Sequence, residues 1–158
     1  RIGAIMAFSS YWVDDPSDIS HYGVKGMKWG VRKAEKRRYK YVSLAKHRLK
    51  LNRSAKATYE KEIERYKKAT ERDLRKEVDD PELFDQFGGI EGYRKALIDD
   101  NIMSRKISEA AIKAGELEVK FYKDLPVSTL KSRKKLKAAK AAFGEERRRA
   151  FMAEYHKE

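Results

Sequence analysis

The feature that most constrains this chain is the stretch from Lys33 to Glu77, which contains neither glycine nor proline. Alanine, lysine, arginine, glutamate and leucine dominate it, and all five are strong helix formers. The stretch therefore predicts one long helix that covers most of residues 34–76. Its apolar residues step mostly by three or four, which favours packing of one narrow face against a single neighbour. This stripe comprises Val42, Ala45, Leu49, Ala55, Tyr59, Ile63, Tyr66 and Leu74.

The positive charge of the chain is concentrated in and just before this predicted helix. Residues 25–76 hold 20 basic and 6 acidic side chains, whereas the whole chain has a net charge of +13. Such an excess suits a polyanionic partner such as nucleic acid. The alternative is a solvated face, because Glu60, Glu62 and Glu64 can pair with cations one turn away. We predict nucleic-acid contacts from Lys36, Arg37, Arg38, Lys40, Lys46, Arg48, Lys50, Arg53, Lys134, Lys135, Arg147, Arg148 and Arg149.

The remaining segments differ from this one in charge and in expected structure. Residues 77–124 carry 7 basic and 12 acidic side chains, and we expect residues 78–124 to form a small acidic core of two or three shorter helices. Residues 125–158 predict a pair of basic helices that is broken near Gly144. Residues 1–20 predict an extended N-terminal arm, because Asp and Ser surround a proline there. No segment shows sustained alternation with a period of two, so we predict an all-α, elongated fold with its long basic helix at 34–77.

Catalytic and cofactor chemistry find little support in the sequence. Cysteine is absent, and the three histidines fall in separate segments without metal-ligand spacing. The paired aspartates at 79–80 and 99–100 lie where helices are expected to begin or end, and capping explains them. No stretch approaches the roughly eighteen consecutive apolar residues of a membrane-spanning helix. We therefore expect no enzyme activity, no catalytic residue, no cofactor, no metal and no membrane span.

A second feature is the run His-Tyr-Gly-Val-Lys-Gly-Met-Lys-Trp-Gly-Val-Arg-Lys at residues 21–33. Its three glycines give the backbone access to positive φ, so the run predicts a compact, irregular turn. Trp and Arg are the residues that most often anchor interfaces. We assign partner docking to His21, Gly23, Gly26, Met27, Lys28, Trp29, Gly30, Val31 and Arg32. The alternative is a structural turn in which Trp29 packs on its own helix, near Tyr39 or Tyr41.

This run resembles the His-x-Gly-(Ile/Val)-x-Gly-x-Lys-Trp-Gly-(Val/Ile)-Arg signature of tailed-bacteriophage virion and head-morphogenesis proteins and of their prophage copies. The matching residues are His21, Gly23, Gly26, Lys28, Trp29, Gly30, Val31 and Arg32. Beyond residues 21–33, only the style of a long basic helix followed by mixed helices is similar. The resemblance implies a head-associated structural protein of the virion, assembled in the host cytoplasm and present in multiple copies per particle. Its implied partners are other virion proteins, such as capsid, portal or connector, and packaged DNA.

Two other classes of protein compete with this interpretation. A non-sequence-specific nucleic-acid-binding helical protein is supported by charge alone. A membrane-surface helix protein would need a broad Leu, Phe and Trp face, and the stripe at 42–74 is too narrow and too rich in Ala and Tyr. Within a virion, the roles of scaffold, internal or ejected protein, minor capsid component and connector subunit all stay open, because they differ in location rather than in composition.

Overall fold

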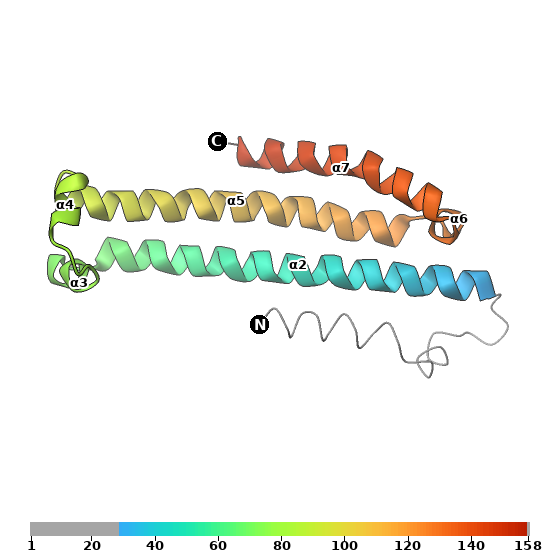
Figure 1. Cartoon of the computed structure of the whole chain (residues 1–158), viewed down its shortest axis with the longest axis horizontal. Coiled ribbons are helices and arrows are strands. Elements are labelled where there is room, and N and C mark those ends of the chain that lie inside the picture. The colour runs from blue at the N-terminus through green and yellow to red at the C-terminus, as the bar shows by residue number, and fades with distance from the viewer. Residues whose placement is uncertain (1–28, 158) are drawn as a thin grey trace.

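A computed structural model describes residues 29–157, and the statements below refer to these residues. The predictions for residues 1–28, which include His21, Gly23, Gly26, Met27 and Lys28, and for the side chain of Trp29 lie outside the described residues. The described chain is built from helices, without strands, and is elongated (Figure 1). The prediction of an elongated all-α fold is therefore confirmed.

Three long helices, α2 (Trp29–Lys68), α5 (Ile90–Asp124) and α7 (Arg133–Tyr155), lie side by side, with α5 in the middle (Figure 1). The short helices α3 (Glu71–Lys76) and α4 (Glu82–Gln86) connect α2 to α5 at one end of the molecule. A third short helix, α6 (Val127–Lys131), connects α5 to α7 at the opposite end. The apolar stripe predicted on α2 faces α5, where Leu49 packs beside Gly115.

The first long helix begins and ends earlier than predicted. It starts at Trp29 and ends at Lys68, and α3 follows as a separate helix. Thr70 begins this new helix with a capping box: its hydroxyl accepts a hydrogen bond from the Asp73 amide (3.2 Å), and the Asp73 carboxylate accepts one from the Thr70 amide (3.1 Å). Such a cap satisfies backbone groups that have no intrahelical partner. The stretch without Gly or Pro is therefore divided into two helices at Thr70, the N-cap residue of α3.

The prediction of an irregular turn is wrong for residues 29–33, which form the start of α2. Among the described residues, positive φ angles occur at Gly88 and Gly89 and not at Gly30. Glycine costs a helix about 1 kcal/mol relative to alanine, yet Gly30 is helical. A Cβ at Gly30 would lie 3.2 Å from Cε of Lys131, so Gly30 lies beside the flexible end of a side chain from α6.

The acidic middle contains one short and one long helix instead of two or three short ones. Gly88 and Gly89, with φ angles of 76° and 108°, follow the end of α4, and α5 then runs unbroken to Asp124. Gly92 lies inside α5 without interrupting it. A Cβ at Gly92 would lie 1.8 Å from the carbonyl oxygen of Phe87, so this glycine allows α5 to start tightly against the end of α4.

The predicted break near Gly144 is also wrong, because α7 is continuous through it. Gly144 is exposed, and a Cβ there would meet nothing within 4 Å. Its neighbour Phe143 is buried and stacks on Phe121 of α5, with ring centroids 4.2 Å apart. Packing of this kind outweighs the roughly 1 kcal/mol by which a glycine disfavours a helix. From Arg133 to Tyr155, the C-terminal region is thus a single basic helix that is anchored on α5.

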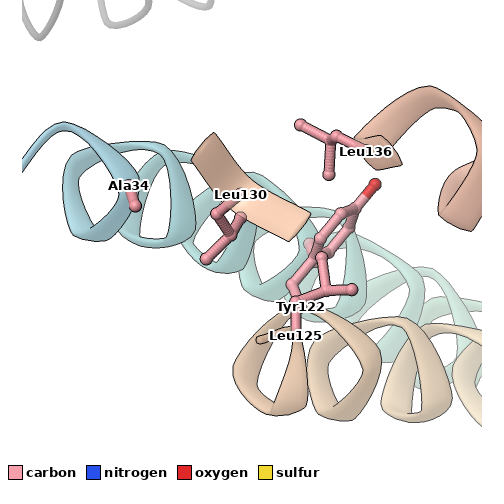
Figure 2. Packing of buried hydrophobic residues seen from close by; sticks show 6 residues of the cluster. Ala34, Tyr122, Leu125, Leu130 and Leu136 are labelled. Atoms are coloured by element: carbon pink, nitrogen blue, oxygen red, sulfur yellow. The ribbon is translucent and has the colours of Figure 1, made fainter. Parts of the chain in front are cut away.

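The main buried cluster lies at the α6 end of the molecule and not, as predicted, within residues 78–124. Side chains from α2, α6 and α7 meet there with residues at the end of α5 (Figure 2). At this end α6 packs against both α2 and α7, and α5 lies between the two long helices, so side chains are enclosed on several sides. The cluster consists of Ala34, Ala45, Tyr122, Leu125, Leu130 and Leu136. Most of residues 78–124 form a helix that packs along α2 and α7 instead.

Candidate polyanion-binding groove

The α6 end of the molecule is built from strongly cationic segments. Residues 125–144, which include α6 and the first half of α7, contain six Lys or Arg residues and no Asp or Glu. Residues 29–50 of α2 contain nine Lys or Arg residues and a single carboxylate, Glu35, which pairs with Arg38 at 3.1 Å. The fold places these two segments together, because α6 packs against both α2 and α7.

A groove of about 420 Å³ lies between α2 and α7 in this region, and we call it the cationic groove. Five cations line it together with one aromatic and one aliphatic side chain, and no carboxylate of the described residues does so. The lining residues are Arg37, Lys40, Tyr41, Arg133, Leu136, Lys137 and Lys140. They recur at intervals of three or four along each helix, which sets them on one helical face. Clefts that focus charge of one sign raise the local concentration of oppositely charged partners.

Within the described residues, Lys140 is held in the cationic groove by aromatic rings and not by a carboxylate. Its Nζ lies 3.7 Å from the centroid of the Tyr41 ring and 5.9 Å from that of Tyr122. The two tyrosines stack with centroids 5.0 Å apart. Burial raises the pKa of Tyr122, so its phenol stays neutral at ordinary pH. A ring positions an ammonium without cancelling its charge, which leaves the charge of Lys140 available to an anion.

Two of the predicted nucleic-acid residues are engaged with backbone carbonyls at helix ends. Arg37 donates from Nη1 to the carbonyls of Leu130 (2.6 Å) and Lys131 in α6, although its side chain also lines the groove. Arg38 donates from Nη1 to the carbonyls of Tyr122 (3.1 Å) and Lys123 (2.6 Å) near the end of α5. The last carbonyls of a helix have no intrahelical partner, and a cation near them is favourable. Arg38 therefore has a structural role.

Three other predicted residues form ion pairs between helices. Glu118 of α5 is 5% exposed and pairs with Arg48 of α2 and with Arg147 of α7, the latter at 3.6 Å. Arg53 of α2 pairs with Glu116 of α5 at 3.3 Å. These pairs support the interpretation that the acidic middle neutralises part of the basic helix. They leave the charge of the cationic groove unaffected, since neither glutamate lines it.

The remaining predicted residues are spread over the surface. Arg148 pairs with Glu145 at 3.2 Å within α7, and Lys36 is half-buried on α2. The exposed residues outside the groove are Lys46, Lys50, Lys134, Lys135 and Arg149. Of all thirteen predicted residues, Arg37 and Lys40 are the two that line the groove.

Sequence reasoning missed Arg133, Lys137 and Lys140, which complete the groove together with Tyr41. The signal for the first three was present, since spacings of four and three place them on one face of a helix. The sequence does not show which other helix this face would meet. The described part of the 21–33 run, Gly30 to Lys33, lies at the same end of the molecule, where Gly30 approaches α6.

Within residues 29–157, no group of three or more His, Cys, Asp or Glu residues is arranged to hold a metal ion. None of the helices in this range combines the length and the apolar character required to cross a bilayer.

Comparison with known proteins gives one short match. Residues 16–36 match the model of a family of unknown function (DUF7211). This segment contains the whole glycine and tryptophan run at 21–33. No curated protein matches the chain, and no solved structure does so either. The match assigns no activity and covers a small part of the chain.

Proposed function

We propose that this chain is a non-enzymatic structural component of a tailed-bacteriophage particle, associated with the head, and that its cationic groove binds the phosphate backbone of packaged nucleic acid. The observation that carries the nucleic-acid part is the lining of the groove, where five cations face one space that no carboxylate of the described residues lines. Phosphate contacts by Lys and Arg supply most of the affinity in non-specific nucleic-acid binding. Arg133, Lys137 and Lys140 on α7, with Lys40 on α2, would make these contacts.

The phage part of the proposal rests on the run at residues 21–33 and its resemblance to virion and head-morphogenesis proteins. Docking to a capsid, portal or connector protein through this run belongs to the same proposal. Val31 and Arg32 would then act from the first residues of α2, since they are helical and not part of a turn. Assembly would take place in the host cytoplasm, with several copies in each particle.

The nucleic-acid part is tested by binding of the full chain to duplex DNA over a series of salt concentrations. The groove variant Arg133→Glu/Lys137→Glu reverses two exposed cations near the start of α7, where carboxylates are tolerated by the helix dipole. Its affinity should fall on the order of tenfold or more. The slope of log affinity against log salt should also become less steep by about 0.9 per lost phosphate contact.

The matched control is Lys61→Glu/Lys113→Glu, which changes the net charge equally at exposed sites outside the groove. Lys61 lies about 30 Å from Lys40 along α2 at 1.5 Å per residue. If groove and control variants lose affinity equally, total charge and not the groove governs binding. If the native chain binds no duplex DNA at low salt, the nucleic-acid part of the proposal is wrong.

The competing function, a nucleic-acid-binding protein outside any particle, makes the same prediction for the groove. Particle purification separates the two. A virion component should remain with particles after nuclease digestion and a high-salt wash, whereas a protein held only by exposed nucleic acid should be released.

A further inference from the structure

A segment at the end of the molecule opposite the cationic groove has the reverse charge. Residues 77–93, which include α4 and the start of α5, contain six Asp or Glu residues and no Lys or Arg. Residues 125–144 at the other end contain six Lys or Arg residues and no Asp or Glu. Figure 1 places α4 and α6 at opposite ends of the long axis. The two segments therefore carry opposite charge, although cations of α3 and of the last turn of α2 also lie at the α4 end.

The acidic end carries an exposed aromatic residue, and we call residues 79–91 the acidic tip. Phe87 is 43% exposed at the end of α4, beside Gly88 and Gly89. One edge of its ring is occupied by Tyr93, with centroids 5.5 Å apart. Large exposed aromatic residues are the type of side chain that anchors interfaces.

Carboxylates surround this aromatic residue in sequence, and several are available for pairing. Asp79, Glu82 and Asp85 are exposed and enter no ion pair within the described residues. The nearest cations in sequence are those of α3 and Arg94. Of these, Arg94 pairs with Glu91 at 3.0 Å, and Arg75 lies over the Phe84 ring at 5.8 Å.

The cationic groove has the complementary chemistry. Tyr41 and Leu136 supply apolar surface within it, and cations of α2 and α7 surround them. Its volume of about 420 Å³ falls within the range of roughly 300–1,000 Å³ that accommodates a ligand-sized group. Phe87 and the carboxylates near it are thus complementary to the apolar surface of Tyr41 and Leu136 and the cations around it.

We infer that the acidic tip of one copy of this chain docks in the cationic groove of a second copy, with Phe87 at the centre of the contact. The two surfaces of one molecule cannot meet, because Lys40 and Tyr66 at the two ends of α2 are about 40 Å apart at 1.5 Å per residue. The contact joins two different surfaces, so it is heterologous. Repetition of such a contact gives a ring if the rotation closes and an open filament if it does not. This inference does not rest on nucleic-acid binding, although nucleic acid would compete for the same groove.

Self-association is tested on the full, nuclease-treated chain by sedimentation velocity at low and high salt. The native chain should form species larger than the 18.4 kDa monomer at low salt and dissociate as salt screens the charges. The tip variant Glu82→Lys/Asp85→Lys and the groove variant Arg133→Glu/Lys137→Glu should each associate on the order of a hundredfold more weakly, because like charges then face each other. Phe87→Ala should weaken association without a change in net charge.

A mixture of the tip and groove variants tests whether the two surfaces contact each other. An equimolar mixture of the tip and groove variants restores oppositely charged surfaces, so association should return although each variant alone is monomeric. Circular dichroism of each variant establishes that its helices are intact. The inference is overturned if the native chain stays monomeric at low salt, if nuclease treatment abolishes association, or if the mixture remains monomeric.

The same variants separate this inference from the proposed function. The tip variant should lose none of the duplex-DNA affinity of the native chain, because its groove is unchanged and the charge that it gains is positive. Native self-association without DNA binding would leave the inference standing and remove the nucleic-acid role. DNA binding by a chain that never associates would do the opposite.

Discussion

The ammonium of Lys140 lies 3.7 Å from the centroid of the Tyr41 ring, and the two residues come from α7 and α2, which pack on α5 from either side. The Tyr41 ring also stacks on Tyr122 of α5. One aromatic ring therefore links the three long helices beside the cationic groove. Such a link fixes the position of α7 without an acidic partner, which would have reduced the positive charge of the groove.

Substitution of Tyr41 tests this link. Tyr41→Leu keeps an apolar side chain but removes the stacking and the cation–π contact, and we expect a loss of about 2 kcal/mol in the free energy of unfolding. Tyr41→Phe retains the ring and should cost less than about 0.5 kcal/mol. Urea denaturation followed by circular dichroism measures both. Equal losses for Leu and Phe would mean that the ring face contributes nothing.

Glu118 provides a second link between the three long helices, since its buried carboxylate pairs with Arg48 and Arg147. Glu118→Gln keeps the shape but removes the charge, and we expect a loss of about 2 kcal/mol because two arginines lose their partner. Arg147→Met should cost less than about 1 kcal/mol. The Arg147 side chain is 49% exposed, and Arg48 still neutralises the carboxylate. Denaturation midpoints with unchanged slopes would measure both losses, and a larger loss for Arg147→Met would contradict this order.

The sequence predicts the helices well because helix propensity is local. The Gly- and Pro-free stretch after Lys33 is helical almost throughout, and the break at Thr70 coincides with a capping pattern that can be read from Thr70 and Asp73 alone. Gly30, Gly92 and Gly144 are different. Glycine disfavours a helix, yet each of these three lies within one. Tertiary packing therefore decides whether a helix continues through a glycine despite its cost in free energy.

The sequence could predict each cationic helix face of the groove separately, but not the groove that the two faces form together. Arg37 and Lys40 stand out in the basic helix, and the spacing of Arg133, Lys137 and Lys140 marks one face of another. Whether these faces meet depends on the tight connection through α6, which returns the chain along α5. No local pattern specifies that register. For the same reason, sequence reasoning placed the core in the acidic middle and not at the α6 end of the molecule.

The glycines give a prediction in which two similar substitutions have opposite effects. Gly144→Ala should stabilise the protein by about 0.5–1 kcal/mol, because the position is helical and a Cβ there meets nothing within 4 Å. Gly92→Ala should destabilise it by about 2 kcal/mol or more, because the new Cβ would collide with the Phe87 carbonyl oxygen. Thermal unfolding of both variants provides the measurement. A stabilised Gly92→Ala protein would mean that the α4–α5 turn can open without cost.

The last prediction concerns acid sensitivity at α3, where the capping box joins Thr70 to Asp73. Hydrogen bonds from the Thr70 amide and then from its hydroxyl lower the pKa of Asp73 below its usual range. A carboxyl whose pKa is lower in the folded state stabilises that state at pH values above its ordinary pKa, and this contribution disappears as the pH falls through the lowered pKa. We therefore expect α3 to lose helicity on acidification before the long helices do. Chemical shifts of residues 71–76 in an NMR titration would report this loss. Asp73→Asn should remove the pH dependence, and Thr70→Ala should weaken α3 at every pH because it deletes the hydroxyl of the cap. An unchanged titration of α3 in Asp73→Asn would assign the acid response to another group.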